Sequence, residues 1–437
     1  MAKKKELTPE EKIQQALVPK EEQPYPLPEG WKWVRLGDIT KIVGGGTPSS
    51  SVKEYYEDGN IAWISPSDLS NYSEKYISYG AKNITKLGLE KSSAQLMPKG
   101  TVLLSSRAPI GYVAIAKIAL STNQGFKNFL PSPSYLPDYL YWYLKGNTEI
   151  LKRYASGTTF LELSAKKAAL IKFPLAPIEE QKRIVQTIEK YFCRLDKIQE
   201  ILKSILCDSG KRKSAILHKA FTGELTVKWR EENKIQLDSW EEHPLSDIAR
   251  ISSGGTPSRK VLEYYQGDIP WIKTGEIYWN YIFDSEEHIS EDALNSSSAK
   301  CYLPGTVLVA MYGQGLTRGR AAILNVKAAT NQAVCALQPF DNVKSKFLYY
   351  YFMNNYWRYR GLAVGGNQPN YSATMISRWR IKVPTLKEQE KIVCIIDQLF
   401  DKEKQFCNSA NSVLKIIELL RQSILINAFH GSLIMDK

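Results

Sequence analysis

Residues 45–64 read GGTPSSSVKEYYEDGNIAWI, and residues 254–272 read GGTPSRKVLEYYQGDIPWI. The first glycines of the two stretches are 209 positions apart (254 − 45), and Tyr55–Tyr56 returns as Tyr264–Tyr265. Similarity at a fixed period indicates that one structural unit occurs more than once. The sequence therefore predicts an internal duplication, with copy 1 before residue 226 and copy 2 after it.

The similarity continues through the whole chain at an offset between 205 and 209. The shared segments are LGDI (36–39) and LSDI (245–248), PKGTVLL (98–104) and PGTVLV (304–309), TNQ (122–124) and TNQ (330–332), EEQKRIV (179–185) and KEQEKIV (387–393), and AFTGEL (220–225) and AFHGSL (428–433). Because the offset changes so little, we expect two copies of one fold with few insertions. At 437 residues the chain is also long enough for two or more domains.

The charge balance favours a polyanionic partner. The chain has 58 Lys and Arg against 45 Asp and Glu, a net charge of +13, of which residues 1–225 carry +10 (33 − 23) and residues 226–437 carry +3 (25 − 22). Such an excess is typical of proteins that neutralise nucleic-acid phosphates, although a merely soluble basic protein has the same composition.

Other features of the composition argue against membrane and metal classes. No apolar run reaches the ~18 residues that a membrane span needs, and the first residues, MAKKKELTPEEK, are charged. The six cysteines include no CxxC pair and the four histidines are scattered, so we expect neither a disulfide framework nor a metal site. These features predict a cytoplasmic protein without a membrane anchor.

Each copy divides into two parts. The first mixes β-type runs such as 101–104 and 112–116 with turns and an aromatic helix near 138–155, which indicates an α/β or α+β domain. The YLYWYL stripe at 139–144 could stack on bases, but its spacing favours a helix that packs into its own core.

The second part of each copy is a long helix with a coiled-coil seam, because apolar residues recur at alternating steps of four and three. The predicted seam consists of Ile184, Ile188, Tyr191, Leu195, Ile198 and Leu202 in copy 1 and of Ile392, Ile396, Leu399, Phe406, Val413, Ile417 and Leu420 in copy 2. We expect the two helices to pair with each other, the alternative being that each lies on its own domain. The run DSGKRK at 208–213 predicts a break in the first helix.

No catalytic motif stands out in the sequence. GGGTPSS lacks the lysine of a phosphate loop and has a proline after its threonine, so it indicates a turn at the end of a strand. Glu180-Gln-Lys182 resembles the end of a nuclease carboxylate motif, but charged side chains at that position would solvate a helix start. We expect no catalytic residue, metal or cofactor in this chain.

The repeated segments together resemble the specificity subunits of type I restriction–modification enzymes. The resemblance covers nearly the whole chain and rests on W-x4-LGDI or LSDI, GGTPS, PKGTVL or PGTVL, TNQ and the start of each long helix, which reads P-x-x-EQ from Pro177 and P-x-x-x-EQ from Pro384. It implies two target-recognition domains, each followed by a long helix, with the two helices paired as an antiparallel coiled coil.

The resemblance also implies the biological role. A specificity subunit has no catalytic activity; it reads a split target in double-stranded DNA, bridges two modification (methyltransferase) subunits and recruits restriction (translocase–nuclease) subunits. S-adenosylmethionine, ATP and Mg would then belong to the partners, and the host would be bacterial or archaeal. Two alternatives stay open: a self-contained DNA methylase or nuclease with degenerate motifs, and an assembly scaffold that binds RNA or an acidic protein.

These considerations predict the following boundaries: an N-terminal tail over 1–29, recognition domain 1 over 30–180, a coiled-coil helix over 181–225, a linker over 226–239, recognition domain 2 over 240–386 and a second coiled-coil helix over 387–433.

Segments that differ between the copies are the candidates for reading DNA. Residues 65–97 share little with 273–303, and 105–110 differ from 310–318. Side chains able to contact base edges or phosphates in these segments are Ser65, Ser67, Asp68, Lys75, Ser106 and Arg107 in copy 1, and Lys273, Thr274, Glu276, Tyr312, Gln314, Arg318 and Arg320 in copy 2. The matched Asn123–Gln124 and Asn331–Gln332 are expected to be structural or to contact phosphates, since they cannot distinguish two half-sites.

Overall fold

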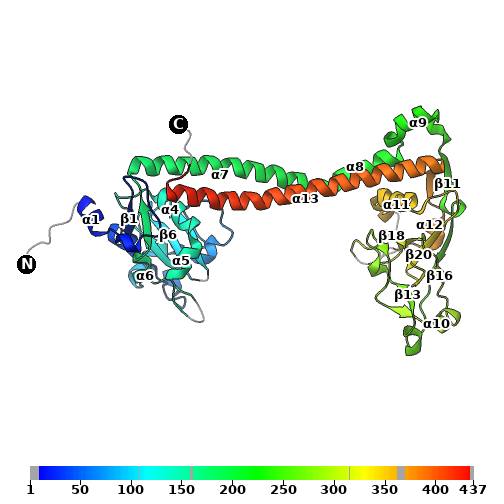
Figure 1. The fold of residues 1–437 in the computed structure, drawn as a ribbon. Helices are drawn as coiled ribbons and strands as arrows, with labels where there is room; N and C mark the ends of the chain where they lie inside the picture. The colour runs from blue at the N-terminus through cyan, green and yellow to red at the C-terminus, as the bar shows by residue number, and fades with distance from the viewer. Residues whose placement is uncertain (1–8, 108, 158–160, 314, 362–369, 434–437) are drawn as a thin grey trace, which may run out of the picture. The chain divides into compact units, whose positions relative to one another are not determined.

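The computed structural model describes residues 9–107, 109–157, 161–313, 315–361 and 370–433. The chain forms two compact units (Figure 1): unit 1 contains Met1–Ile201 and Ser412–Lys437, and unit 2 contains Leu202–Asn411. Each unit therefore combines the sheet-bearing domain of one copy with a segment of the other copy's long helix. Within the described residues, no helix has the length and apolar character of a membrane span.

Unit 1 contains two mixed sheets and a strand pair. The five-stranded sheet has the order β2 (Ile42–Gly44), β9 (Phe126–Phe129), β6 (Val102–Ser106), β7 (Ile110–Ala116), β4 (Tyr76–Ile77). The smaller sheet has the order β5 (Lys82–Ile84), β3 (Ile61–Ile64), β8 (Ser121–Thr122), and β1 (Lys32–Arg35) pairs antiparallel with β10 (Lys172–Leu175).

Unit 2 repeats this topology, with β16 as one additional strand in its second sheet. Its five-stranded sheet has the order β12 (Ala249–Ser253), β20 (Val334–Pro339), β17 (Val307–Ala310), β18 (Ala321–Leu324), β14 (Tyr281–Ile282). Its second sheet has the order β15 (His288–Ile289), β13 (Ile269–Ile272), β19 (Ala328–Thr330), β16 (Cys301–Tyr302), and β11 (Glu241–Pro244) pairs with β21 (Arg380–Val383). The predicted duplication and the mixed α/β class are confirmed.

The glycine-rich stretch is a turn that lies against the backbone of the TNQ segment. A Cβ on Gly45 would come within 1.9 Å of the Asn123 carbonyl oxygen, so only glycine fits there. The next carbonyl, that of Gly46, accepts a hydrogen bond from the Trp63 indole at 2.9 Å. The equivalent bond in unit 2 joins the Trp271 indole to the Gly255 carbonyl at 3.0 Å. The stretch is thus part of the frame of each domain.

The aromatic helices α4 (Pro137–Gly146) and α11 (Ser345–Arg360) pack into the cores of their units. Tyr139 and Tyr143 are buried and both make edge-on ring contacts with Phe173 of β10. The prediction that YLYWYL packs its own core is confirmed.

The first long helix is interrupted where the sequence predicted a break. Helix α7 (Ile178–Cys207) ends at Asp208 and α8 (Ser209–Phe221) begins directly after it. Helix α13 (Leu386–His430) is continuous over 45 residues. In unit 2 the Arg212–Glu403 and Ser209–Cys407 contacts show that α8 and α13 are antiparallel, because one residue number rises as the other falls.

The start of each long helix is fixed in its own domain by a buried glutamine. Of the charged residues beside Gln181, Lys182 is exposed as expected, whereas Glu180 is half-buried and accepts a hydrogen bond from Trp31. Gln181 and Gln389 are fully buried. The amide of Gln181 donates to the carbonyls of Ser134 and Ala176, and its oxygen accepts from the Leu136 N–H at 2.9 Å. The glutamine therefore satisfies backbone groups that a hydrocarbon side chain would leave unpaired.

Parts of the segments named as tail and linker are ordered. Ala16 and Val18 are buried, and the Val18 N–H donates to the Trp33 carbonyl of β1 at 2.9 Å. Residues Val227–Asn233 of the linker form helix α9, whose Arg230 is buried. These residues belong to the packed units because their apolar and charged side chains find partners there.

Candidate functional site

The first divergent loop of unit 1 is organised by a carboxylate. Asp68, in the short helix Pro66–Leu69, accepts hydrogen bonds from the Ser65 N–H at 2.7 Å and from the Ser65 hydroxyl at 2.6 Å. Its other oxygen accepts from the Ala81 N–H at 2.8 Å. The structure thus brings Ser65, Ser67 and Asp68 together, and Asp68 shapes the loop while Ser67 stays exposed.

Lys75 lies apart from that loop. Its ammonium forms ion pairs with Asp138 of α4 and Glu189 of α7, and only 18% of the side chain is exposed. Burial acts to lower the pKa of Lys75, but the hydrogen bonds and charges of Asp138 and Glu189 raise it overall. Lys75 therefore connects the recognition domain to the long helix, and its charge is already neutralised.

The second divergent segment of unit 1 contains a buried basic cluster. The Ser106 hydroxyl is fully buried, donates to the Gly125 carbonyl at 3.0 Å and accepts from the Lys127 ammonium at 3.1 Å. Glu162 lies 3.7 Å from Lys127 and 3.8 Å from Arg107. Arg107 is 40% exposed and is the member of the cluster that can reach a partner.

Sequence comparison missed Lys127. Burial lowers its pKa although Glu162 acts in the opposite direction. The β-sheet register pairs Lys127 with Leu104 and Cys335 with Val309, so Cys335 is its counterpart in unit 2. A lysine in the buried strand β9, where β20 has a cysteine, was the signal that could have identified it.

The corresponding loop of unit 2 is held by Glu276. Its carboxylate accepts from the Lys273 N–H at 2.8 Å and from the Glu286 N–H at 3.2 Å. The Lys273 ammonium lies 2.9 Å from Glu287, which raises the pKa of Lys273. Thr274 is half-buried in the same turn. Glu276 therefore occupies the place of Asp68, with different neighbours.

The loop after β17 is anchored by the end of α11. The Tyr356 hydroxyl donates to the Leu316 carbonyl at 2.5 Å, and Arg360 donates to the carbonyls of Arg318 at 2.6 Å and Gly315 at 2.7 Å. Among the candidates, Tyr312 is 40% exposed, Arg318 and Arg320 are half-buried, and Gln314 lies outside the described residues. Arg360, which the sequence did not indicate, positions this loop.

The matched TNQ segments have local partners. The Thr47 hydroxyl donates to Gln124 and the Thr256 hydroxyl to Gln332. The side-chain oxygen of Asn123 accepts from the Gly125 N–H at 2.9 Å, and that of Asn331 from the Ala333 N–H at 3.1 Å. Both pairs therefore fasten the glycine turn and its neighbouring loop in the same way.

The long helices bury only part of the predicted seam. Ile184, Ile188, Ile392, Ile396 and Ile417 are buried and Tyr191, Leu195, Leu202 and Leu399 are half-buried, whereas Ile198 (43%), Phe406 (48%), Val413 (39%) and Leu420 (44%) are exposed.

The least exposed stripe of α13 follows the ordinary helix period. It contains residues 392, 396, 399, 403, 407, 410, 414, 417, 421, 425 and 428, which is 36 residues in ten steps, or 3.6 per step. A strict alternation of three and four averages 3.5 and drifts about 20° per heptad from this stripe. Beyond Glu403 the predicted positions Phe406, Val413 and Leu420 therefore leave the buried face, and Ile417 stays on it.

Two arginine–carboxylate pairs lie along the helices, one in each unit. In unit 2, Arg212 contacts both oxygens of Glu403, with its closest approach at 2.7 Å, and Glu403 is 8% exposed. In unit 1, Arg421 lies 2.5 Å from Asp196 and over the ring of Phe192. Hydrogen bonds from Arg212 lower the pKa of Glu403 from 4.5 to about 2.

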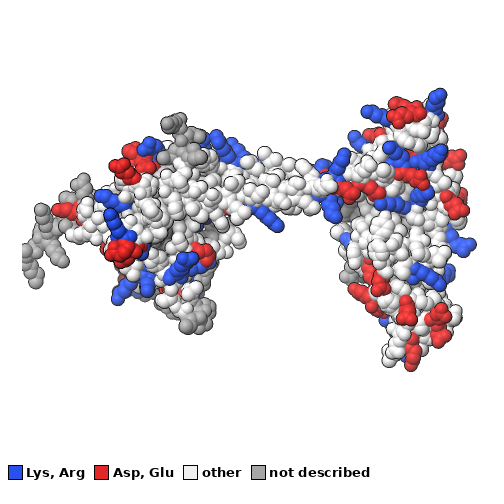
Figure 2. Space-filling view, viewed as in Figure 1, with Lys and Arg blue, Asp and Glu red and all other residues white. Residues whose placement is uncertain are grey.

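The visible surface mixes both signs of charge. In Figure 2, Lys and Arg alternate with Asp and Glu on both units, and acidic residues gather around α10 (Glu291–Asn295) of unit 2. Among the described residues, no group of three or more His, Cys, Asp or Glu side chains is placed to hold a metal ion. The positive net charge is therefore not gathered into one patch on this face.

Comparison with known proteins identifies both copies. The model of the type I restriction modification DNA specificity domain matches residues 28–206 and again residues 238–411. The specificity subunit of the type I restriction enzyme MjaIX from Methanocaldococcus jannaschii is 31% identical over 418 residues, covering 94% of this chain and 95% of the relative. The MjaVIII specificity subunit of the same organism is 24% identical over 416 residues, covering 90% and 92%.

Solved structures share the fold over the same length. The HsdS subunit from Thermoanaerobacter tengcongensis superposes with a TM-score of 0.64 at 18% identity, covering 94% of this chain and 100% of that chain. A chain from a study of complex assembly and conformational transition in the type I R-M system gives a TM-score of 0.65 at 19% identity, with the same coverage. Both comparisons extend over the two repeated domains and the long helices.

Proposed function

This chain belongs to the family of type I restriction–modification DNA specificity subunits, and we propose from this premise that it is a non-catalytic subunit that directs modification and restriction partners to a split target. Recognition domain 1 would read one half of the double-stranded target and recognition domain 2 the other. Two modification subunits and the restriction subunits would supply the chemistry, together with their S-adenosylmethionine, ATP and Mg.

The observation that carries this proposal is one frame built twice with different side chains at the same places. Both units fasten the glycine turn to a tryptophan and a TNQ segment. At the end of the central strands, Ser106 and Lys127 in unit 1 stand where Met311 and Cys335 stand in unit 2. A shared frame with different polar groups is what two different half-sites require, since base edges are distinguished by donors and acceptors.

The test compares the chain alone with the assembled complex. The purified chain is incubated with S-adenosylmethionine and plasmid DNA, with and without its modification subunit. We expect methyl transfer to specific sites only when this chain and the modification subunit are both present. When this chain is omitted, those sites should stay unmethylated. Methyl transfer or DNA cleavage by the chain alone would instead support a self-contained enzyme. Binding to RNA in preference to duplex DNA would support an assembly scaffold.

A further inference from the structure

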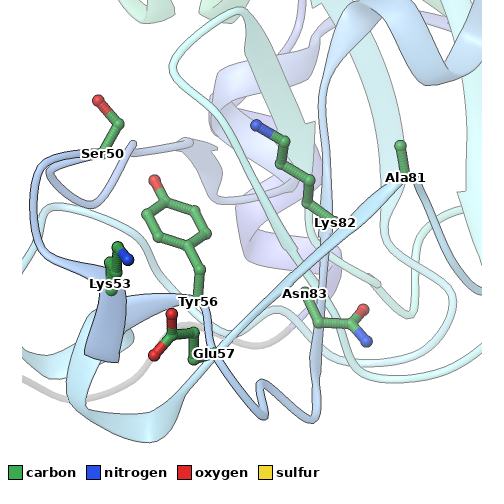
Figure 3. Close-up of a pocket in the computed structure, with 7 residues that line it drawn as sticks. All are labelled: Ser50, Lys53, Tyr56, Glu57, Ala81, Lys82 and Asn83. Atoms are coloured by element: carbon green, nitrogen blue, oxygen red, sulfur yellow. The ribbon is translucent and has the colours of Figure 1, made fainter.

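A polar pocket of about 490 Å³ opens on recognition domain 1, between the glycine turn, the short helix Lys53–Tyr55 and strand β5 (Figure 3). The residues that line it are Ser50, Lys53, Tyr56, Glu57, Ala81, Lys82 and Asn83. Figure 3 shows the Lys82 side chain extending from β5 toward the side of the pocket on which Tyr56 and Ser50 lie. Neither Lys53 nor Lys82 has an ion-pair partner within the described part of the chain.

At the equivalent place in unit 2 lies the side chain of an arginine, Arg259. The guanidinium of Arg259 lies 4.1 Å from the ring centroid of Tyr265 and 5.1 Å from that of Trp271. It also lies 2.7 Å from Glu287, and together with Lys273 it lowers the pKa of that carboxyl. This arrangement is an arginine–carboxylate pair stacked on an aromatic wall, with the Arg259 side chain 54% exposed.

The repeat shows which residues of unit 1 replace that pair. Ser50 corresponds to Arg259 because each is the fifth residue after the first glycine of its GGTPS stretch. Lys82 corresponds to Glu287 because Lys82 pairs with Trp63 in the sheet, and the Glu287 carbonyl accepts from the Trp271 N–H at 2.8 Å. Unit 1 therefore has a serine in place of the arginine and a lysine in place of the carboxylate.

This exchange replaces a neutral ion pair by a pocket with a net positive charge. Lys53 stands where unit 2 has Leu262, so two lysines and one carboxylate, that of Glu57, line the pocket. Ser50 adds a hydroxyl, a group that commonly donates to phosphate oxygens in protein–DNA complexes, whereas the Asn83 side chain points away from that of Lys82 (Figure 3). The pocket suits an anion, while the arginine of its counterpart is already paired with Glu287.

The pocket also adjoins the loop that differs between the copies. Ala81, which lines it, donates its N–H to Asp68 at 2.8 Å, and Asp68 organises the candidate loop at 65–69. A group held in the pocket would therefore fix the position of that loop.

We propose that this pocket binds a phosphate of the DNA backbone next to the half-site read by recognition domain 1, and that recognition domain 2 has no equivalent contact. The inference rests on the proposed function and deepens it, because it makes the two domains unequal in how they hold the duplex. The acidic residues gathered near α10 agree with this difference, since that end of unit 2 would repel a phosphate.

The first test measures the salt dependence of DNA binding by the full chain assembled with its modification subunit. In fluorescence anisotropy titrations at increasing KCl, the K53A/K82A variant is expected to lower the slope of log Kd against log salt by about 1, the value for one phosphate contact. Affinity for specific and non-specific duplexes should fall by the same factor. Lys86→Ala, an 84% exposed lysine of the same unit outside the pocket, serves as the matched control.

The second test rebuilds the arginine–carboxylate pair of unit 2. In S50R/K82E the new arginine can stack on Tyr56 and pair with the new carboxylate, so the domain should keep its melting temperature while the salt slope falls as in K53A/K82A. Glu57→Gln, which removes the carboxylate of the pocket, should strengthen binding to both duplexes and steepen the slope.

The outcomes separate this inference from the proposed function. An unchanged salt slope in folded K53A/K82A, or a loss confined to specific DNA, would overturn the phosphate contact. In the same preparations the wild-type complex is assayed for site-specific methylation. Failure of that assay would contradict the proposed function, whereas success with an unchanged slope would contradict only the pocket.

Discussion

The indole nitrogen of Trp240 donates a hydrogen bond to Glu388 at 3.0 Å, joining the first residues of recognition domain 2 to the start of its long helix. Glu388 is fully buried and also accepts from Arg230 at 2.8 Å and from the Thr226 hydroxyl at 2.7 Å. The corresponding bond in unit 1 joins Trp31 to the half-buried Glu180 at 2.8 Å. The two junctions are equivalent in position, but in unit 2 the glutamate also pairs with a buried arginine, Arg230.

Glu388→Ala should therefore destabilise the protein more than Glu180→Ala. Removing Glu388 leaves Arg230 buried without its carboxylate, which typically costs about 3–5 kcal/mol. Removing Glu180 costs mainly one hydrogen bond, about 0.5–1.5 kcal/mol. Chemical denaturation of the two variants checks this order, and equal losses would show that Arg230 finds another partner.

The Arg212–Glu403 pair predicts a stability difference that depends on pH. Because the pKa of Glu403 is lowered from 4.5 to about 2, its ionised form stabilises the folded chain above pH 4.5, and this contribution is lost as the pH falls toward 2. Wild type should therefore melt at a higher temperature than Glu403→Gln at pH 7. The gap should begin to close below about pH 4.5. A gap that is independent of pH from 7 to 3.5 would show that the charge of Glu403 contributes nothing.

The same pair has apolar counterparts in the repeat, which suggests a second experiment. At an offset of 208, Glu403 corresponds to Leu195 and Arg212 to Leu420. The single variant Glu403→Leu should destabilise the chain because it removes the carboxylate from Arg212. The double variant R212L/E403L should recover most of the loss, since replacing a complete ion pair by hydrocarbon is often neutral or stabilising. If the double variant is as unstable as the single one, the pair is not the source of the effect.

Positions on the long helices should differ in tolerance according to their burial. Lysine at the fully buried Ile188 or Ile396 removes an apolar contact worth about 1.5–3 kcal/mol and places a charge in the core. The matched control is Ile198→Lys, at a predicted seam position that is 43% exposed. We expect the first two variants to unfold at lower temperature and to lose assembly with the modification subunit, while the control retains both. Similar losses in all three variants would instead support the seam that the sequence predicted, in which buried positions alternate at steps of three and four residues.

The sequence predicted the duplication, the sheet-bearing domains and the break at Asp208, because each depends on local or repeated patterns. It could not predict that Gln181 and Glu388 are buried, since their partners lie far away in the chain. It could not predict that Lys75, one of the candidate DNA-reading residues, forms ion pairs with Asp138 and Glu189, because divergence between copies does not reveal such contacts. Lys127 was missed because a strand residue next to phenylalanines is expected to be structural.

The central claim is that each recognition domain reads one half of a split target, and mapping methylated sites tests it most directly. The complex of this chain and its modification subunit methylates a random DNA library, and the marked sites are sequenced for wild type and for Arg107→Ala. Arg107 is the exposed member of the basic cluster of unit 1, and a lost base contact typically costs about 1–3 kcal/mol. We predict that wild type marks two specified sequences separated by a spacer of constant length, and that Arg107→Ala relaxes only one of them. A single contiguous target, or equal relaxation of both parts, would contradict the account.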